Sequence, residues 1–306
     1  MDFYLSTNWN ASRHATGEAL VDEIIALGFD GVELGYRLSE SQAAGVLRRV
    51  QAGAVRVGSV HAYAPYPLGA PAGHPELYLL ASRDEDDRIM ATVLLQKTLR
   101  FAAEAGARAV VVHAGRIPIT PASHELIEAA EEDGLTSRRY TKLWQRNQRR
   151  RARHARKHLE ALYRSLDLLL PLCARLQLTL CLENLPSWEA IPTEDEMLAL
   201  HQRYASPHLG YWHDIGHGQV RENLGWIQHR AAAERLLPIT AGLHIHDVLP
   251  LAHDHLPPPH GKLPFADFAF YGTAPLLRVF EPAPAVPSAD LIAGRLHVQQ
   301  AWRARQ

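Results

Sequence analysis

Short runs of apolar residues alternate along this chain with longer segments in which apolar residues recur every three or four positions. The short runs are typical of parallel β-strands buried on both faces, and the longer segments predict amphipathic helices. The expected strands cover residues 3–6, 31–34, 57–61, 109–113, 178–183, 209–214, 242–246 and 277–281. The expected helices include residues 18–27, 39–51, 84–105, 158–175 and 194–204.

Eight strands with helices in most of the gaps predict an α/β fold, a single-domain (β/α)8 TIM barrel over residues 1–306. A chain of this length with 47% hydrophobic residues can bury such a core. A nucleotide-binding sheet is disfavoured, because no G-x-G-x-x-G follows the first strand and no Walker A sequence occurs.

Two segments depart from the alternating pattern. The first is a loop rich in proline and glycine over about residues 64–83, which either closes over a substrate or is an ordinary surface loop. The second is a basic insertion over about residues 131–157, in which ten of the twenty residues from Arg138 to Lys157 are lysine or arginine. Because the acidic stretch HELIEAAEED precedes it, we expect an exposed helical hairpin with partly neutralised charges. A clamp for a phosphate-bearing substrate is the alternative.

The overall composition excludes few functions but limits the partners. The net charge of −1 gives no global attraction to nucleic acid or to anionic membranes. Cys173 and Cys181 are too few for a disulfide framework, the N-terminus lacks signal-peptide features, and no apolar run reaches the roughly 18 residues of a membrane span. We therefore expect a cytoplasmic protein. The 18 dispersed histidines suggest metal binding, since imidazole is the commonest metal ligand among side chains.

Six of the eight expected strands end on a residue that can bind a metal ion. These residues are His61, His113, Glu183, Asp214, His244 and Glu281. One such residue is usually only a hydrogen-bonded or capping group, but six in order predict a metal centre at the carboxyl rim of the barrel. His217 and His255 follow shortly after the sixth and seventh strands and extend the set. Strand alternation predicts that His213 and His246 point away from this centre.

The ligand types narrow the choice of metal. Imidazole and carboxylate without thiolate suit Zn²⁺, Mn²⁺, Fe²⁺ or Co²⁺. Eight candidates exceed the about four to six ligands of one ion. Either some of these residues hydrogen-bond to the ligands without touching the ion, or the pocket holds two or three ions. Four further residues either line the pocket or serve the structure, namely Glu33, Arg116, Trp212 and Lys262.

The motifs along the chain resemble one superfamily, the xylose isomerase-like TIM barrels. That superfamily includes sugar-phosphate isomerases and epimerases as well as endonuclease IV. The resemblance covers roughly residues 1–285 and rests on FDGVELG, VHAY, LASRDEDDR, VVVHAG, LCLEN, HDIGHG, LHIHDV, DHLPP and VFEP, in that order.

The isomerase and epimerase branch implies one Mn²⁺-like ion, held by residues that match Glu183, Asp214, His244 and Glu281. In that branch the two glutamates are catalytic and exchange a proton at the carbon next to a carbonyl.

The endonuclease IV branch implies two or three Zn²⁺ ions. By this resemblance His61, His113 and Glu183 hold the first ion. Glu183 also binds a second ion, together with Asp214, His244 and Glu281. A third ion is held by His217 and by an Asp-x-His pair, of which His255 matches the histidine. His253 stands where that pair has its aspartate, and Pro259 and His260 replace the usual glycine-rich turn, which puts the third ion and the loop shape in doubt.

Because an isomerase does not need both His61 and His113, the sequence favours hydrolysis of a phosphodiester or phosphate ester. A small molecule, such as the nucleotide loop of a corrinoid, is the expected substrate. Nucleic acid is not favoured, since only residues 138–157 form a basic stretch. The alternative is a mononuclear ketose isomerase or epimerase that uses Glu183 and Glu281 for proton transfer. A barrel that only binds a ligand is disfavoured, because neither glutamate is lost. The sequence does not indicate an oligomeric state.

Overall fold

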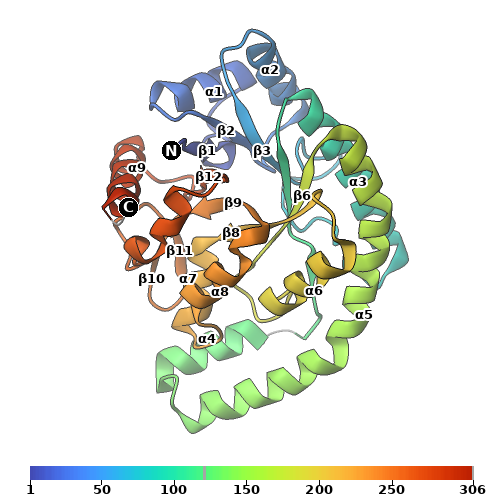
Figure 1. Cartoon of the computed structure of the whole chain (residues 1–306), viewed down its shortest axis with the longest axis vertical. Helices are drawn as coiled ribbons and strands as arrows, with labels where there is room; N and C mark the ends of the chain where they lie inside the picture. The colour runs from blue at the N-terminus through green and yellow to red at the C-terminus, as the bar shows by residue number, and fades with distance from the viewer. Residues whose placement is uncertain (120–121, 305–306) are drawn as a thin grey trace.

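Eight parallel strands close into a barrel surrounded by helices in the computed structural model, which describes residues 1–119 and 122–304 (Figure 1). Around the barrel the strand order is β1-β12-β9-β8-β6-β4-β3-β2. The bounds are β1 Tyr4–Ser6, β2 Gly31–Leu34, β3 Val57–His61, β4 Ala109–Val112, β6 Thr179–Glu183, β8 Leu209–Asp214, β9 Thr240–Ile245 and β12 Leu277–Phe280. The structure confirms the predicted (β/α)8 barrel.

The strands are apolar because both of their faces are covered. Every residue of β2, β3, β4, β8 and β12 is buried. Side chains that face the barrel axis form a small interior cluster of Tyr4, Ala109, Val111, Cys181, Trp212, Leu277 and Val279. The opposite faces pack against the helices in the main core. The carboxylate and imidazole side chains of the strands lie at or near their carboxyl ends, where the chain turns toward the rim.

The helices follow the expected pattern, and capping boxes at Ser39–Gln42 and Thr193–Glu196 start two of them. Their bounds are α1 Gly17–Ala26, α2 Glu40–Gln51, α3 Glu85–Glu104, α4 Ala122–Asp133, α5 Arg138–Leu176, α6 Glu194–Tyr204, α7 Ile215–Asn223, α8 His229–Leu236 and α9 Ser288–Arg303. Short 3-10 helices are η1 Thr7–Trp9, η2 Leu237–Ile239 and η3 Phe265–Gly272. In the described part of the chain, no helix is long and apolar enough to cross a membrane.

Two short antiparallel strand pairs lie in the loops that follow the barrel strands. Strand β5 (Gly115–Arg116) pairs with β7 (Ala190–Ile191), and β10 (Asp247–Leu249) pairs with β11 (His253–Leu256). The first pair joins the loop after β4 to the loop after β6, and the second folds the segment after β9 back on itself.

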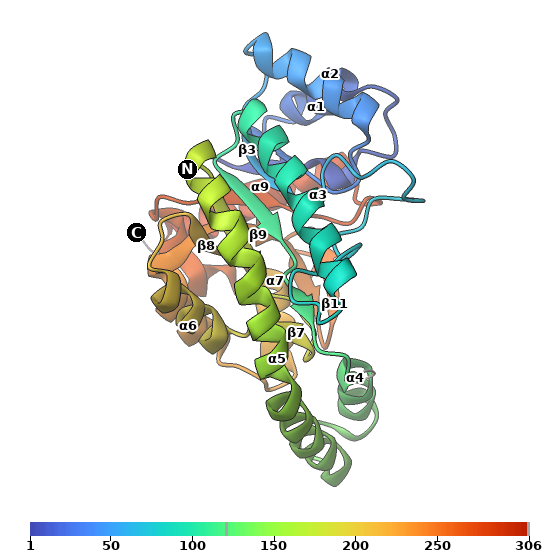
Figure 2. The same cartoon turned by 90° about the vertical axis from the view of Figure 1, so that its right-hand side faces the viewer.

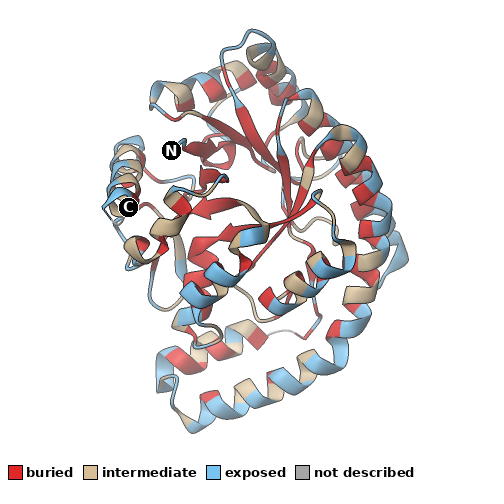
Figure 3. Cartoon of the chain, viewed as in Figure 1, coloured by how far each residue is buried: buried red, intermediate tan, exposed pale blue. Residues whose placement is uncertain are grey.

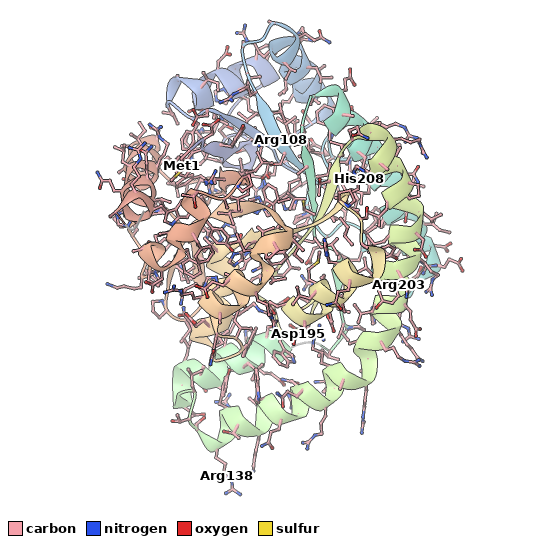
Figure 4. All side chains as sticks on the ribbon, viewed as in Figure 1. Met1, Arg108, Arg138, Asp195, Arg203 and His208 are labelled. Carbon is pink, nitrogen blue, oxygen red and sulfur yellow. The ribbon has the colours of Figure 1, made fainter. Side chains whose placement is uncertain are left out.

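The basic segment belongs to a helical hairpin of α4 and α5 that projects beyond the barrel (Figure 2). The sequence suggested separate basic and amphipathic segments, but α5 is one continuous helix of 39 residues. Its outer half is mostly exposed (Figure 3), and Arg138 lies at the outer end (Figure 4). Arg139 pairs with Glu132 and Asp133 of α4, so part of the charge is neutralised within the hairpin.

One face of the hairpin packs on the loop after β6, which carries Trp188, and on the loop after α7, which carries Trp226. The Trp144 and Trp188 rings lie 4.4 Å apart, and the Trp226 indole donates a hydrogen bond to the Tyr140 hydroxyl at 2.9 Å. Arg151 forms a two-point ion pair with Glu196, at 2.6 and 2.9 Å. The hairpin therefore supports the loops that surround the carboxyl rim.

Candidate metal centre

Four of the predicted ligands converge at the carboxyl ends of neighbouring strands. Glu183 ends β6, Asp214 ends β8, His244 lies in β9 and Glu281 follows β12. One donor atom from each of the four lies within 4.8 Å of the other three, and all four residues are buried. His244 Nδ1 is 3.0 Å from Glu183 Oε1 and 3.1 Å from Glu281 Oε2. Parallel strands with staggered ends thus bring distant sequence positions into one group.

A second layer fixes the orientation of the His244 ring. The Glu33 carboxylate, at the end region of β2, lies 3.0 Å from His244 Nε2 and accepts a hydrogen bond from Ser59 Oγ at 2.8 Å. The Trp212 ring packs edge-to-face on the imidazole at 5.3 Å. With Nε2 bonded to a carboxylate, Nδ1 is directed toward the ligand group, which is how metal-binding histidines are usually held.

The electrostatics keep the carboxylates ionised. Burial raises the pKa of Glu183, but the charges of His244 and His113 and their hydrogen bonds lower it well below its usual range. Burial also raises the pKa of Asp214, and the charges of His217 and His246 lower it overall. Ionised carboxylates grouped this closely suit a cation, since like charges at such distances repel each other unless a positive charge lies between them.

Glu183 also borders a second group with His61 and His113. Its Oε2 atom is 3.1 Å from His61 Nε2 and 3.2 Å from His113 Nε2. Its Oε1 atom faces His244, so the two oxygens of one carboxylate serve two neighbouring groups. The His61 ring stacks on that of His244 at 5.6 Å. Burial lowers the pKa of His113, but Glu183 and Glu76 raise it to about 9.

A third group consists of His217, His246 and His255. His246 Nε2 is 2.9 Å from Asp214 Oδ1, and its ring stacks on that of His255 at 4.1 Å. The expected outward orientation of His246 is therefore wrong. Strand β9 ends at Ile245, so strand alternation no longer applies at His246. His213 does point away, with Nδ1 at 2.6 Å from the Tyr271 hydroxyl.

His253 is exposed and lies outside the three groups, although the sequence placed it among the metal ligands. The register of β10 and β11 is irregular, and His255 has a φ of 54°, which breaks the regular alternation of side chains. The neighbouring Asp254 approaches the third group instead, with Oδ2 at 3.9 Å from His217 Nε2. In the sequence, only the position of Asp254 between His253 and His255 indicated that it could lie near the site.

A cavity of about 290 Å³ opens above the ligand groups. Of the four residues with uncertain roles, Arg116 lines this cavity, Glu33 and Trp212 lie behind His244, and Lys262 is exposed and outside the lining. Glu76 and His74, from the loop after β3, also line the cavity. Sequence reasoning missed both of them, because only the folded loop shows which of its residues turn inward.

A model of the family described as xylose isomerase-like TIM barrel matches residues 21–270. The chain belongs to the xylose isomerase-like TIM-barrel family. A comparison with curated proteins finds no match.

Solved structures of similar fold align with nearly the whole of this chain. A D-tagatose 3-epimerase-like protein has a TM-score of 0.71 at 17% identity and covers 100% of this chain and 98% of its own. A 3-keto-D-glucoside 4-epimerase from E. coli has a TM-score of 0.70 at 17% identity, with coverages of 98% and 99%. A putative xylose isomerase from Rhodospirillum rubrum has a TM-score of 0.69 at 14% identity, with coverages of 100% and 99%. These names are consistent with the prediction of an enzyme, while identities this low establish only the fold.

The donor set in this xylose isomerase-like barrel fits a divalent ion. Imidazole and carboxylate ligands are combined without thiolate, as in Zn²⁺ and Mn²⁺ sites. The carboxylates are held ionised, and a buried carboxylate supports the ligand histidine from behind. The structure therefore brings together eight of the nine predicted ligands, in groups that share or adjoin one another.

Proposed function

We propose that the protein is a divalent-metal-dependent isomerase or epimerase that acts on a sugar or a related ketose. The observation that carries this proposal is the group of Glu183, Asp214, His244 and Glu281, with donor atoms within 4.8 Å of one another. Two glutamates border the same histidine nitrogen, at 3.0 and 3.1 Å. A substrate above this group would meet a carboxylate on either side.

The reaction class requires removal of a proton from a carbon next to a carbonyl and its return to the same or a neighbouring carbon. A divalent ion held by the four residues would polarise the carbonyl and the adjacent hydroxyl. Glu183 and Glu281 would exchange the proton as general base and general acid. Asn8 Nδ2 donates a hydrogen bond to Glu281 Oε1 at 3.2 Å, which fixes the orientation of that carboxylate.

The comparisons support this alternative better than the phosphoester hydrolysis that the sequence first favoured. The similar structures carry the names of tagatose, psicose and ribulose 3-epimerases and of a ketoglucoside 4-epimerase. The cavity of about 290 Å³ is at the small end of the range for ligand pockets, which suits a monosaccharide.

The test is exchange of carbon-bound hydrogen with solvent. Metal-loaded protein is incubated with a panel of ketoses in D₂O, and deuterium incorporation is followed by NMR. At equal metal content, Glu281→Gln should slow exchange by about 10²- to 10⁴-fold while substrate still binds, because the variant keeps the shape but loses the base. The exposed Glu40→Gln on α2 is the control and should behave like the wild type. If the wild-type protein exchanges no hydrogen with any ketose, the proposal fails.

One observation favours a second candidate, phosphoester hydrolysis. The groups His61–His113–Glu183 and His217–His246–His255 provide ligands beyond those that a single ion needs. Two or three ions there would activate water and neutralise phosphate oxygens. Elemental analysis of protein purified without chelator separates the candidates. Two or three zinc ions per chain, with about one ion lost in His113→Ala, would support hydrolysis, and one manganese ion would support isomerisation.

A further inference from the structure

The loop after β3 carries one carboxylate into the cavity. Residues 62–83 contain a single acidic residue, Glu76, whose side chain is only 13% exposed. Glu76 forms an ion pair with Arg116 of β5 and lies 3.6 Å from His113 Nδ1. Its backbone N–H donates a hydrogen bond to His74 Nδ1 at 3.0 Å, so the turn that presents the carboxylate is itself fixed.

Arg116 is the only arginine or lysine among the described residues that line the cavity. The lining also contains four carboxylates, from Glu76, Glu183, Asp254 and Glu281. A guanidinium at the mouth of a sugar pocket is the natural partner of a phosphate group, which it can bind with two parallel hydrogen bonds. Here the partner of that guanidinium is already Glu76.

A phosphate group that binds Arg116 through two parallel hydrogen bonds would compete with this carboxylate for the guanidinium. Glu76 would then lose its ion pair with Arg116 and keep only the more distant His113, while remaining mostly buried beside a pocket that already contains three other carboxylates. Removing one partner of such a pair costs more than the pair contributes when it is intact, because the remaining charge is left unsatisfied. Sugar hydroxyls can instead hydrogen-bond to both members of the intact pair.

Resting on the isomerase or epimerase activity proposed above, we propose that Glu76 excludes phosphorylated substrates by occupying Arg116, and that the substrate is an uncharged sugar. Glu76 thereby acts as a specificity determinant supplied by the loop after β3. The loop lines the pocket through His74, Pro75 and Glu76, and the last of these contributes to its charge.

The experiment compares a free ketose with its terminal phosphate ester on wild-type protein, Glu76→Gln and the double variant Glu76→Gln/Arg116→Gln. The wild type should prefer the free ketose in kcat/KM for hydrogen exchange. Glu76→Gln should shift that preference toward the ester by about 10- to 100-fold, because it releases a guanidinium that can bind phosphate. The double variant should lose this shift. Metal content is measured for each protein, so that an effect through His113 is recognised.

Calorimetric binding of inorganic phosphate provides a readout that does not depend on turnover. Glu76→Gln should bind phosphate more tightly than both the wild type and the double variant. A wild-type preference for the ester would overturn the inference, as would an unchanged preference in Glu76→Gln at equal metal content. The absence of exchange with both substrates would instead refute the proposed function, and phosphate binding would then decide whether Glu76 masks Arg116.

Discussion

Replacement of Glu33 by glutamine tests whether His244 is a metal ligand, because it leaves every candidate ligand residue unchanged. Glu33 is fully buried, and its two carboxylate oxygens lie 3.0 and 3.1 Å from His244 Nε2. Glutamine keeps the size and one acceptor oxygen but removes the charge. The substitution therefore weakens the support of the imidazole while its Nδ1 atom stays near Glu183 and Glu281.

The expected magnitude follows from the geometry. A carboxylate behind a ligand histidine fixes the ring and raises the basicity of the ligating nitrogen, and its loss typically lowers metal affinity by about 10- to 100-fold. That range equals about 1.4 to 2.7 kcal/mol of binding free energy. Ser59→Ala removes only the hydroxyl that donates to Glu33 Oε2 at 2.8 Å, so its effect should be smaller.

The assay is titration of chelator-treated protein with Mn²⁺ and with Zn²⁺ in a calorimeter, with a competing chelator to bring tight binding into range. Urea unfolding of the metal-free proteins shows separately whether Glu33→Gln has only destabilised the fold. If the folded Glu33→Gln protein binds both metals as tightly as the wild type, His244 does not act as a ligand in the proposed orientation.

Two further predictions concern the residues around the centre. Burial lowers the pKa of His213 to about 4, whereas the histidine of the unfolded chain takes up its proton near pH 6.5. Stability that is present at neutral pH should therefore be lost as the pH falls from about 6.5 to about 4. Urea unfolding at pH 7 and pH 4.5 should show about 2 kcal/mol of this loss in the wild type and a smaller loss in His213→Gln, and equal losses would contradict the assignment. In Gly216→Ala the added Cβ would overlap the His246 ring, so the pair of His246 with Asp214 should break and the free energy of unfolding should fall by about 1–3 kcal/mol. An unchanged free energy of urea unfolding would show that the ring can move without cost.

The barrel and most of the ligand groups could be predicted because both depend on local patterns. A parallel strand covered on both faces favours a continuous apolar run, as in Ala109–Val112, and the first polar residue after the run marks the rim. His113 and Glu183 stand out for this reason. The hairpin of α4 and α5 was also expected from its charge pattern, but the contact between the Trp144 and Trp188 rings was not, since it joins segments that are distant in sequence.

The remaining features of the centre depend on loops, whose geometry is not periodic. His246 follows the last residue of β9, and one change of direction there turns its ring toward Asp214 rather than away from it. Within β11, the irregular register and the positive φ of His255 place one histidine in the third group and leave His253 exposed. Glu76 reaches Arg116 from a loop that has no regular structure. If the proposed function holds, side chains at the strand ends would supply most of the metal ligands, and Glu76 and Arg116 in the loops would limit which substrates reach them.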